Sequence, residues 1–157
     1  MERIAVRFSL SFWRVSEELM IVDSRHPELA LPTEKLLLNI LTALGYPREL
    51  PSAEIVQWPM IDAPHQDQGD TAARETLHAF LDAQFLLNPG RHLLLMGSDA
   101  AHYLLSGEQP YTDLLGSEQK LEEFDLTARI TPSLTEMLQE PAKKAVTWQA
   151  IRGLRRG

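Results

Sequence analysis

Two short segments of this chain are apolar without interruption, and they limit the folds that it can adopt. Residues 19–22 read Leu-Met-Ile-Val, and residues 93–96 read Leu-Leu-Leu-Met. A half-exposed strand alternates apolar and polar side chains, whereas a strand without alternation is covered on both faces. The sequence therefore predicts an α/β fold in which helices lie on either side of a sheet.

Strand and helix patterns alternate along the remainder of the chain. Apolar positions of period two from Ile4 to Phe12 predict a first strand with one apolar face, paired as a hairpin with residues 19–22. Because strands that alternate with helices pair mainly in parallel, we expect one domain over residues 1–157, a three-layer αβα fold with a mostly parallel central sheet. Further strands are expected at 54–58, 92–96 and 124–130, helices at 35–44, 72–87, 99–105 and after 133, and loops at 62–71 and before 124.

The composition excludes several classes of protein. The chain has no cysteine, so a disulfide framework, a thiolate zinc site and a cysteine-ligated iron–sulfur cluster are excluded. No apolar run approaches the roughly 18 residues that span a bilayer, and the N-terminus lacks the apolar region of a signal peptide. We therefore expect a cytoplasmic protein with no membrane association. A net charge of −7 argues against strong direct binding of nucleic acid.

The basic residues are concentrated at the C-terminus. The last fifteen residues contain no aspartate or glutamate. A solvated helix face with favourable charge near a helix C-terminus accounts for this pattern. Contact with nucleic acid or with an acidic partner is the alternative. The cluster consists of Lys143, Lys144, Arg152, Arg155 and Arg156.

Loops that leave the C-terminal ends of parallel strands are where ligands gather in an open sheet. The loop after the second strand contains Asp23, the one residue there that could act as a base, although a carboxylate just past a strand is more typical of a turn or a helix cap. A later loop has the single glycine Gly97, which is too weak a signal for a nucleotide cradle. Ser98 is expected to be the N-cap of the helix that follows, and the charge of Asp99 disfavours a phosphate there.

The last of these loops is Thr131-Pro132-Ser133. Glu136 follows Ser133 by three residues, which is the spacing of a capping box. We therefore expect this serine to cap the next helix.

No metal or nucleophile signature is found elsewhere. The five histidines include no i, i+4 pair and no H-x-E motif, and the serines include no G-x-S-x-G elbow. His78 and His102 fall on predicted helices and are expected to be half-exposed. We predict no catalytic residue, no cofactor and no metal site. The histidines are His26, His65, His78, His92 and His102.

The segment from Ile130 to Trp148 has a distinctive order: a strand end, a Thr-Pro-Ser turn, a short helix, a proline and a final helix with a tryptophan. This order resembles the last motif of the uracil-DNA glycosylase superfamily. Active members have a histidine immediately before the proline, where this chain has Thr131. Threonine cannot supply an imidazole donor to a departing uracil. In addition, no glycine occurs between Met1 and Leu44, so the first loop has little freedom to approach a flipped base closely.

A glycosylase-like fold without the catalytic residues is similar to the psi subunit family of the bacterial DNA polymerase III clamp loader. The matching parts are Ile21-Val22-Asp23, residues 36–44 followed by Gly-Tyr-Pro, residues 93–97, and Pro-Ser-Leu-Thr-x-x-Leu-x-x-Pro-x-x-Lys-x-x-x-Trp over 132–148. The resemblance implies a non-catalytic subunit that forms a 1:1 heterodimer with chi. It also implies binding to the gamma/tau subunits and, through chi, an indirect link to single-stranded DNA-binding protein. The alternatives are a catalytically active member of the glycosylase superfamily, another nucleotide-binding α/β enzyme, or an α/β adaptor of another assembly.

The resemblance also raises expectations about partner-binding surfaces. It implies a collar-binding segment upstream of the folded domain with a tryptophan of its own. The first strand begins almost at Met1, and Trp13 lies too close to the second strand, so we expect collar binding to be lost or performed differently. Trp148 is expected in the core. The residues of the chi interface are not assigned, but a bridging subunit needs exposed apolar side chains, and the candidates are Phe12, Trp13, Trp58, Met60 and Tyr111.

Overall fold

The computed structural model describes residues 6–59, 68–87, 90–105 and 109–155. Met60, His65 and Arg156 lie outside the described residues, as does most of the loop predicted at 62–71. Among the described residues, no helix has the length and apolar character needed to cross a bilayer.

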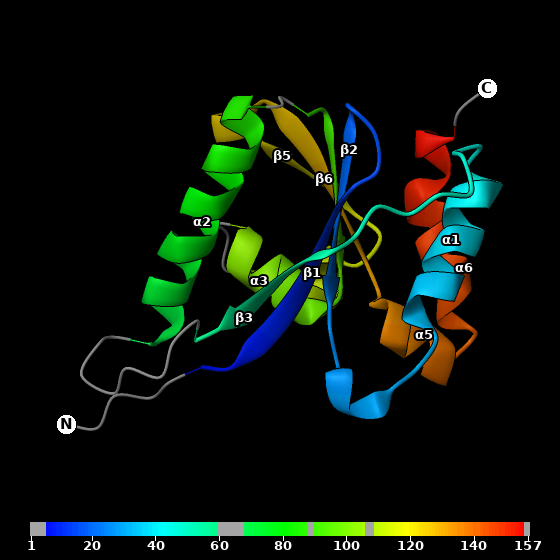
Figure 1. Ribbon diagram of the computed structural model, residues 1–157, viewed down its shortest axis with the longest axis horizontal. Coiled ribbons are helices and arrows are strands. Elements are labelled where there is room, and N and C mark those ends of the chain that lie inside the picture. Colours follow the sequence, from blue (N-terminus) through cyan, green and yellow to red (C-terminus); the bar gives the residue numbers. More distant parts are fainter. Residues whose placement is uncertain (1–5, 60–67, 88–89, 106–108, 156–157) are drawn as a thin grey trace.

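A six-stranded sheet forms the centre of the molecule (Figure 1). β2, β4 and β6 are parallel, β1 is antiparallel to both β2 and β3, and β5 is antiparallel to β6. The α/β class and the β1–β2 hairpin are thus confirmed. Across the sheet the strands are β3 (Glu54–Trp58), β1 (Phe8–Arg14), β2 (Leu19–Ser24), β4 (His92–Met96), β6 (Leu126–Thr131) and β5 (Glu118–Leu121).

The prediction of a mostly parallel sheet is wrong, because the sheet is mixed. Three of its five strand pairings are antiparallel. β3 does run in the same direction as β2, β4 and β6, as expected after a helical crossover. Its neighbour, however, is β1, which the hairpin has turned round. β5 was not predicted at all, since its sequence Glu-Gln-Lys-Leu has no apolar alternation.

Helices lie on both faces of the sheet (Figure 1). One face is covered by α1, α5 and α6, and the opposite face by α2 and α3. The predicted helices are confirmed, with bounds that differ by at most two residues. The helices are α1 (Thr33–Ala43), α2 (Asp70–Leu87), α3 (Ser98–Leu104), α4 (Tyr111–Leu114), α5 (Leu134–Gln139) and α6 (Lys143–Ile151), and short 3-10 turns occur at Pro27–Leu29, Glu122–Phe124 and Arg152–Leu154.

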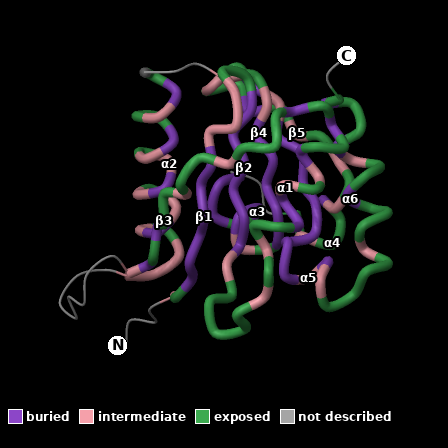
Figure 2. Tube along the Cα trace, turned by 45° about the vertical axis from the view of Figure 1, so that its right-hand side comes forward, coloured by how far each residue is buried: buried purple, intermediate pink, exposed green. Residues whose placement is uncertain are grey.

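The central strands are buried on both faces, as their unbroken apolar runs predict (Figure 2). Leu93 and Leu95 of β4 belong to the core beneath α2 and α3, whereas Leu94 and Met96 belong to the core beneath α1, α5 and α6. β1 was expected to have only one buried face. It is buried on both, because it lies between β2 and β3 and is covered like a central strand.

Most of the side chains predicted to form an exposed apolar patch are in the core. Phe12 and Trp13 are only 3% exposed, and Trp58 is also buried. The prediction is wrong for these residues because β1 is buried on both faces and β3 on the face that carries Trp58, and Phe12 packs against Phe80 of α2 with ring centroids 4.7 Å apart. Tyr111 is half-buried. Trp148, by contrast, was expected in the core and is 39% exposed on α6.

Candidate functional site

The three loops singled out in the sequence meet at one edge of the sheet. In the strand register, Asp23 of β2 lies opposite Met96 of β4, which in turn lies opposite Thr131 of β6. The Gly97 N–H donates to the Thr131 carbonyl oxygen at 2.8 Å. The structure therefore brings the predicted candidate residues together at the C-terminal ends of the parallel strands.

The end of β2 caps one helix on each face of the sheet. Successive residues of a strand point to opposite faces. Asp23 Oδ1 accepts a hydrogen bond from the N–H of Leu134, the first residue of α5, at 3.0 Å. Ser24 Oγ accepts from the N–H of Ala100 in the first turn of α3, also at 3.0 Å. The interpretation of Asp23 as a helix cap is confirmed, and the helix it caps is 111 residues further along the chain.

The carboxyl group of Asp23 is unusual in its environment. The residue is 2% exposed, and this burial raises the pKa of the carboxyl group to about 7. The hydrogen bond from Leu134 and the charge of Arg25 lower the pKa, while the negative charge of Glu136 raises it further. Asp23 also lines a hollow of about 420 Å³ beside Arg25 and other residues. A carboxyl group that titrates near neutral pH has the acid–base property expected of a catalytic base.

Close packing around Gly97 closes the middle of this edge. Gly97 has a φ of 97°, a conformation that residues with a Cβ rarely adopt. A Cβ at this position would lie 2.8 Å from Ser24 Cβ and 2.9 Å from Ser133 Cβ. The loops after β2, β4 and β6 are therefore in direct contact here, and only glycine fits between them.

The predicted cap of α3 is wrong. Gly97 occupies the N-cap position, and Ser98 is the exposed first residue of the helix. The serine that bonds to the helix N-terminus is Ser24, which belongs to a different strand. Ser98 cannot be the N-cap of α3, because it is the first residue of the helix and an N-cap residue precedes the helix.

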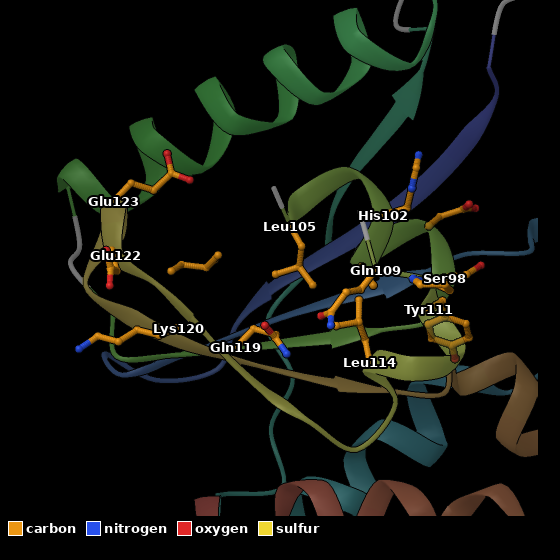
Figure 3. Close-up of a pocket in the computed structure, with 14 residues that line it drawn as sticks. Ser98, His102, Leu105, Gln109, Tyr111, Leu114, Gln119, Lys120, Glu122 and Glu123 are labelled. Atoms are coloured by element: carbon orange, nitrogen blue, oxygen red, sulfur yellow. The ribbon is translucent and has the colours of Figure 1, made fainter. Parts of the chain in front are cut away.

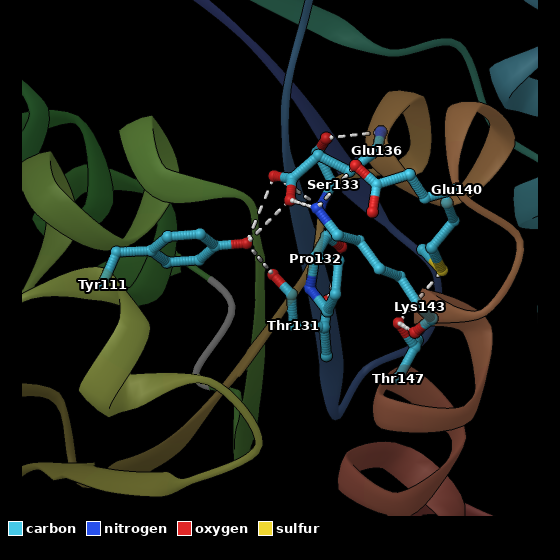
Figure 4. Close-up of polar contacts among 9 residues, drawn as sticks. Tyr111, Thr131, Pro132, Ser133, Glu136, Glu140, Lys143 and Thr147 are labelled. Atoms are coloured by element: carbon cyan, nitrogen blue, oxygen red, sulfur yellow. Dashed lines mark hydrogen bonds and ion pairs between the residues drawn. The ribbon is translucent and has the colours of Figure 1, made fainter.

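The Thr131–Ser133 turn is held by side chains from three helices (Figure 4). The predicted capping box is confirmed: Glu136 N–H donates to Ser133 Oγ at 3.0 Å, and Ser133 N–H donates to Glu136 Oε1 at 3.3 Å. The Glu136 carboxylate also accepts from Tyr111 Oη of α4 and from Lys143 Nζ of α6, each at 3.2 Å. Thr131 is fully buried, and its hydroxyl donates to the Pro132 carbonyl oxygen at 3.0 Å.

The groups around this turn are poorly suited to proton transfer at neutral pH. Burial and the adjacent Glu136 raise the pKa of Tyr111 well above its usual value. The hydrogen bond and charge of Glu136 also raise the pKa of Lys143. An efficient general acid has a pKa near the working pH, and both groups are shifted away from it. The arrangement fixes the geometry of the turn.

The histidines are spread over the molecule. Within the described residues, no group of three or more histidine, aspartate or glutamate side chains is placed to hold a metal ion. His78 and His102 are partly exposed, as predicted. His102 contacts Asp70 and Arg74 of α2. His92 lies 3.1 Å from Arg129, and its pKa is lowered by burial and by that guanidinium.

No family model matches this chain, and no curated protein is significantly similar to it. The fold and the site define the protein as an α/β domain with a mixed sheet, in which side chains at the end of β2 cap α3 and α5. The resemblance to the psi family rests only on the motif residues of this sequence.

Proposed function

We propose that the protein is a non-catalytic bridging subunit of a bacterial DNA polymerase III clamp loader, similar to psi. It adopts the three-layer, uracil-DNA-glycosylase-like arrangement. It joins chi, and through chi the single-stranded DNA-binding protein, to the gamma/tau subunits during DNA replication in the cytoplasm.

One observation carries the proposal. Thr131 occupies the position before the proline where an active glycosylase has a histidine, and it is fully buried with its hydroxyl bonded to the Pro132 carbonyl oxygen. A side chain in this state cannot reach a substrate. The surrounding Ser133–Glu136 capping box and the contact of Glu136 with Tyr111 support a structural role for the whole turn.

An exposed tryptophan suggests where a partner binds. Trp148 of α6 is exposed, and tryptophan is among the residues that most often dominate interface energetics. Lys144 and Arg152 lie one helical turn before and after Trp148, so they occupy the same side of the helix. We propose α6 as part of the chi interface.

A binding experiment tests this function. The purified protein and chi, mixed in equal amounts, should elute as a 1:1 complex in size-exclusion chromatography with light scattering. Trp148→Ala should weaken the complex by at least about 1 kcal/mol, the threshold that separates energetically important interface residues from the others. Leu86→Ala, which removes an exposed leucine from α2 on the opposite face, is the matched control. A protein that stays monomeric in the presence of chi would contradict the proposal.

The second candidate function is an active glycosylase, and the pKa of Asp23 near 7 is the observation that favours it. Single- and double-stranded DNA that contains uracil or hypoxanthine provides the test. If the bridging function is correct, no free base is released. Release that requires the protein and disappears in Asp23→Asn would establish the enzymatic alternative.

A further inference from the structure

A groove of about 640 Å³ runs beside β5, the edge strand of the sheet. It lies on the face of the sheet that α2 and α3 cover. Figure 3 shows its lining, which comes from α3, residues 105, 109 and 110 between α3 and α4, α4 itself, β5 and the turn after β5. Three buried leucines, Leu105, Leu114 and Leu121, contribute the apolar part of this lining. The sequence patterns did not indicate this groove, since β5 itself was not predicted.

The groove follows the edge of β5 as well as one face of the strand. Leu121 and Gln119 point to one face of the sheet and Lys120 to the other, because side chains alternate along a strand. All three residues nevertheless line the groove. β5 is the last strand on this side, and no strand in the described part of the chain pairs with its outer side. Alternate backbone N–H and C=O groups of such an edge are available to a further strand.

The described lining of the groove contains three carboxylates. Ser98 and His102 mark one end in Figure 3, and Asp99 is also part of the lining. Glu122 and Glu123 mark the other end. Among the described residues of the lining, Lys120 is the one lysine or arginine, and the carboxylates are Asp99, Glu122 and Glu123. The groove therefore favours a positively charged ligand.

We propose that this groove binds an extended peptide segment of a partner protein, which adds to the sheet as a seventh strand beside β5. The segment has apolar side chains in its middle, which meet Leu105, Leu114 and Leu121, and basic side chains at both ends, which meet the carboxylates. Main-chain hydrogen bonds supply affinity in this mode of recognition, and alternate side chains supply specificity. The inference does not depend on the proposed function.

The probe is a fluorescent peptide of about eight residues, slightly longer than a typical strand of five to six. Valine and leucine alternate with threonine in its middle, and two lysines stand at each end. It should bind, and it should shift the backbone amide NMR signals of β5 rather than those of β3 at the opposite edge. Two further peptides carry N-methyl groups on alternate residues, one on the odd positions and the other on the even positions. One of the two should bind at least about tenfold more weakly than the parent peptide, because its methyl groups replace the N–H donors that face the edge of β5.

Charge variants test the ends of the groove. Glu122→Lys/Glu123→Lys reverses two exposed charges in the turn after β5 and should weaken binding of the probe at least about tenfold. Glu34→Lys/Glu49→Lys makes the same charge change on exposed residues in and after α1, which lies on the other face of the sheet, and should leave binding within about twofold.

Several results would overturn the inference. They are equal binding of the parent and both methylated peptides, NMR shifts confined to β3, an equal loss in the two double variants, and no binding at all. A protein dimer joined through β5 would also overturn it, since the occupant would then be a second copy of this chain.

Discussion

At the scale of single residues, Asp23 combines a structural role with an energetic cost. Its carboxyl group caps α5, but burial makes the charged form unfavourable. The folded-state pKa of about 7 lies above the value of about 4 expected in the unfolded chain. The unfolded state therefore releases this proton first as the pH rises. Consequently, the contribution of Asp23 to stability is greatest below about pH 4 and is lost as the pH rises to about 7.

Asp23→Asn tests this linkage. Asparagine keeps an oxygen that can accept from Leu134 N–H but cannot ionise, so the free energy of unfolding should become less dependent on pH. Relative to the wild type, the variant should gain stability between pH 5 and pH 8 by at most roughly 3 kcal/mol, because about two of the three pKa units of the shift fall within this range. Urea unfolding at the two pH values measures the gain. An identical stability difference at both values would contradict the raised pKa of Asp23.

Gly97 and Gly116 form a natural pair of test positions. Both have positive φ, of 97° and 79°, so alanine at either position is strained, at a cost of about 1–3 kcal/mol. A Cβ at Gly97 would in addition collide with Ser24 and Ser133, whereas a Cβ at Gly116 meets nothing within 4 Å. Gly97→Ala should therefore lower the free energy of unfolding by about 1–3 kcal/mol more than Gly116→Ala. Urea unfolding of both variants checks this, and equal losses would show that the strand-end loops can separate.

At the scale of elements, the helices around the strand ends are fixed by caps that come from two sources. α5 is capped from within its own sequence by Ser133 and from β2 by Asp23. α3 has no cap from its own sequence and relies on Ser24 of β2. Movement of β2 would therefore disturb a helix on each face of the sheet.

Two serine-to-alanine variants distinguish a real cap from an apparent one. Ser133→Ala removes a buried cap and should cost about 1–2 kcal/mol of stability. Ser98→Ala changes an exposed side chain at the start of α3 and should stay within about 0.5 kcal/mol of the wild type. Thermal or urea unfolding compares them. If Ser98→Ala proved the more damaging, Ser98 would be the true cap of α3.

At the scale of the whole molecule, the distribution of charge limits direct contact with nucleic acid. The chain has a net charge of −7, so the basic residues of the C-terminal region belong to a molecule that is acidic overall. Lys143, moreover, is engaged with Glu136 and Glu140. Among the described residues of this region, the exposed cations that remain for phosphates are Lys144, Arg152 and Arg155.

Direct binding of single-stranded DNA should accordingly be weak. Fluorescence anisotropy at about 0.15 M salt, where the Debye length is about 8 Å, should detect no tight complex. Binding that emerges at low salt should decrease when Lys144, Arg152 and Arg155 are changed to glutamine, because these residues neutralise phosphates. Submicromolar binding at physiological salt that survives these changes would refute the prediction.

The sequence by itself determined the features whose signals are local. The bounds of β3 and β4 agree with the prediction residue for residue, and the hairpin of β1 and β2 and the Ser133–Glu136 capping box were also predicted correctly. Each of these signals depends on residues that are only a few positions apart, through the period of apolar side chains or the geometry of a first helical turn.

Only the tertiary structure decided which elements are neighbours and which side chains they cover. It placed β3 beside β1, buried Trp13 and exposed Trp148, and assigned the cap of α3 to Ser24. It also added β5, whose polar sequence forms a strand because β6 offers it an edge with which to pair. These outcomes depend on contacts between residues far apart in the chain, such as Asp23 and Leu134, and no local pattern specifies such contacts.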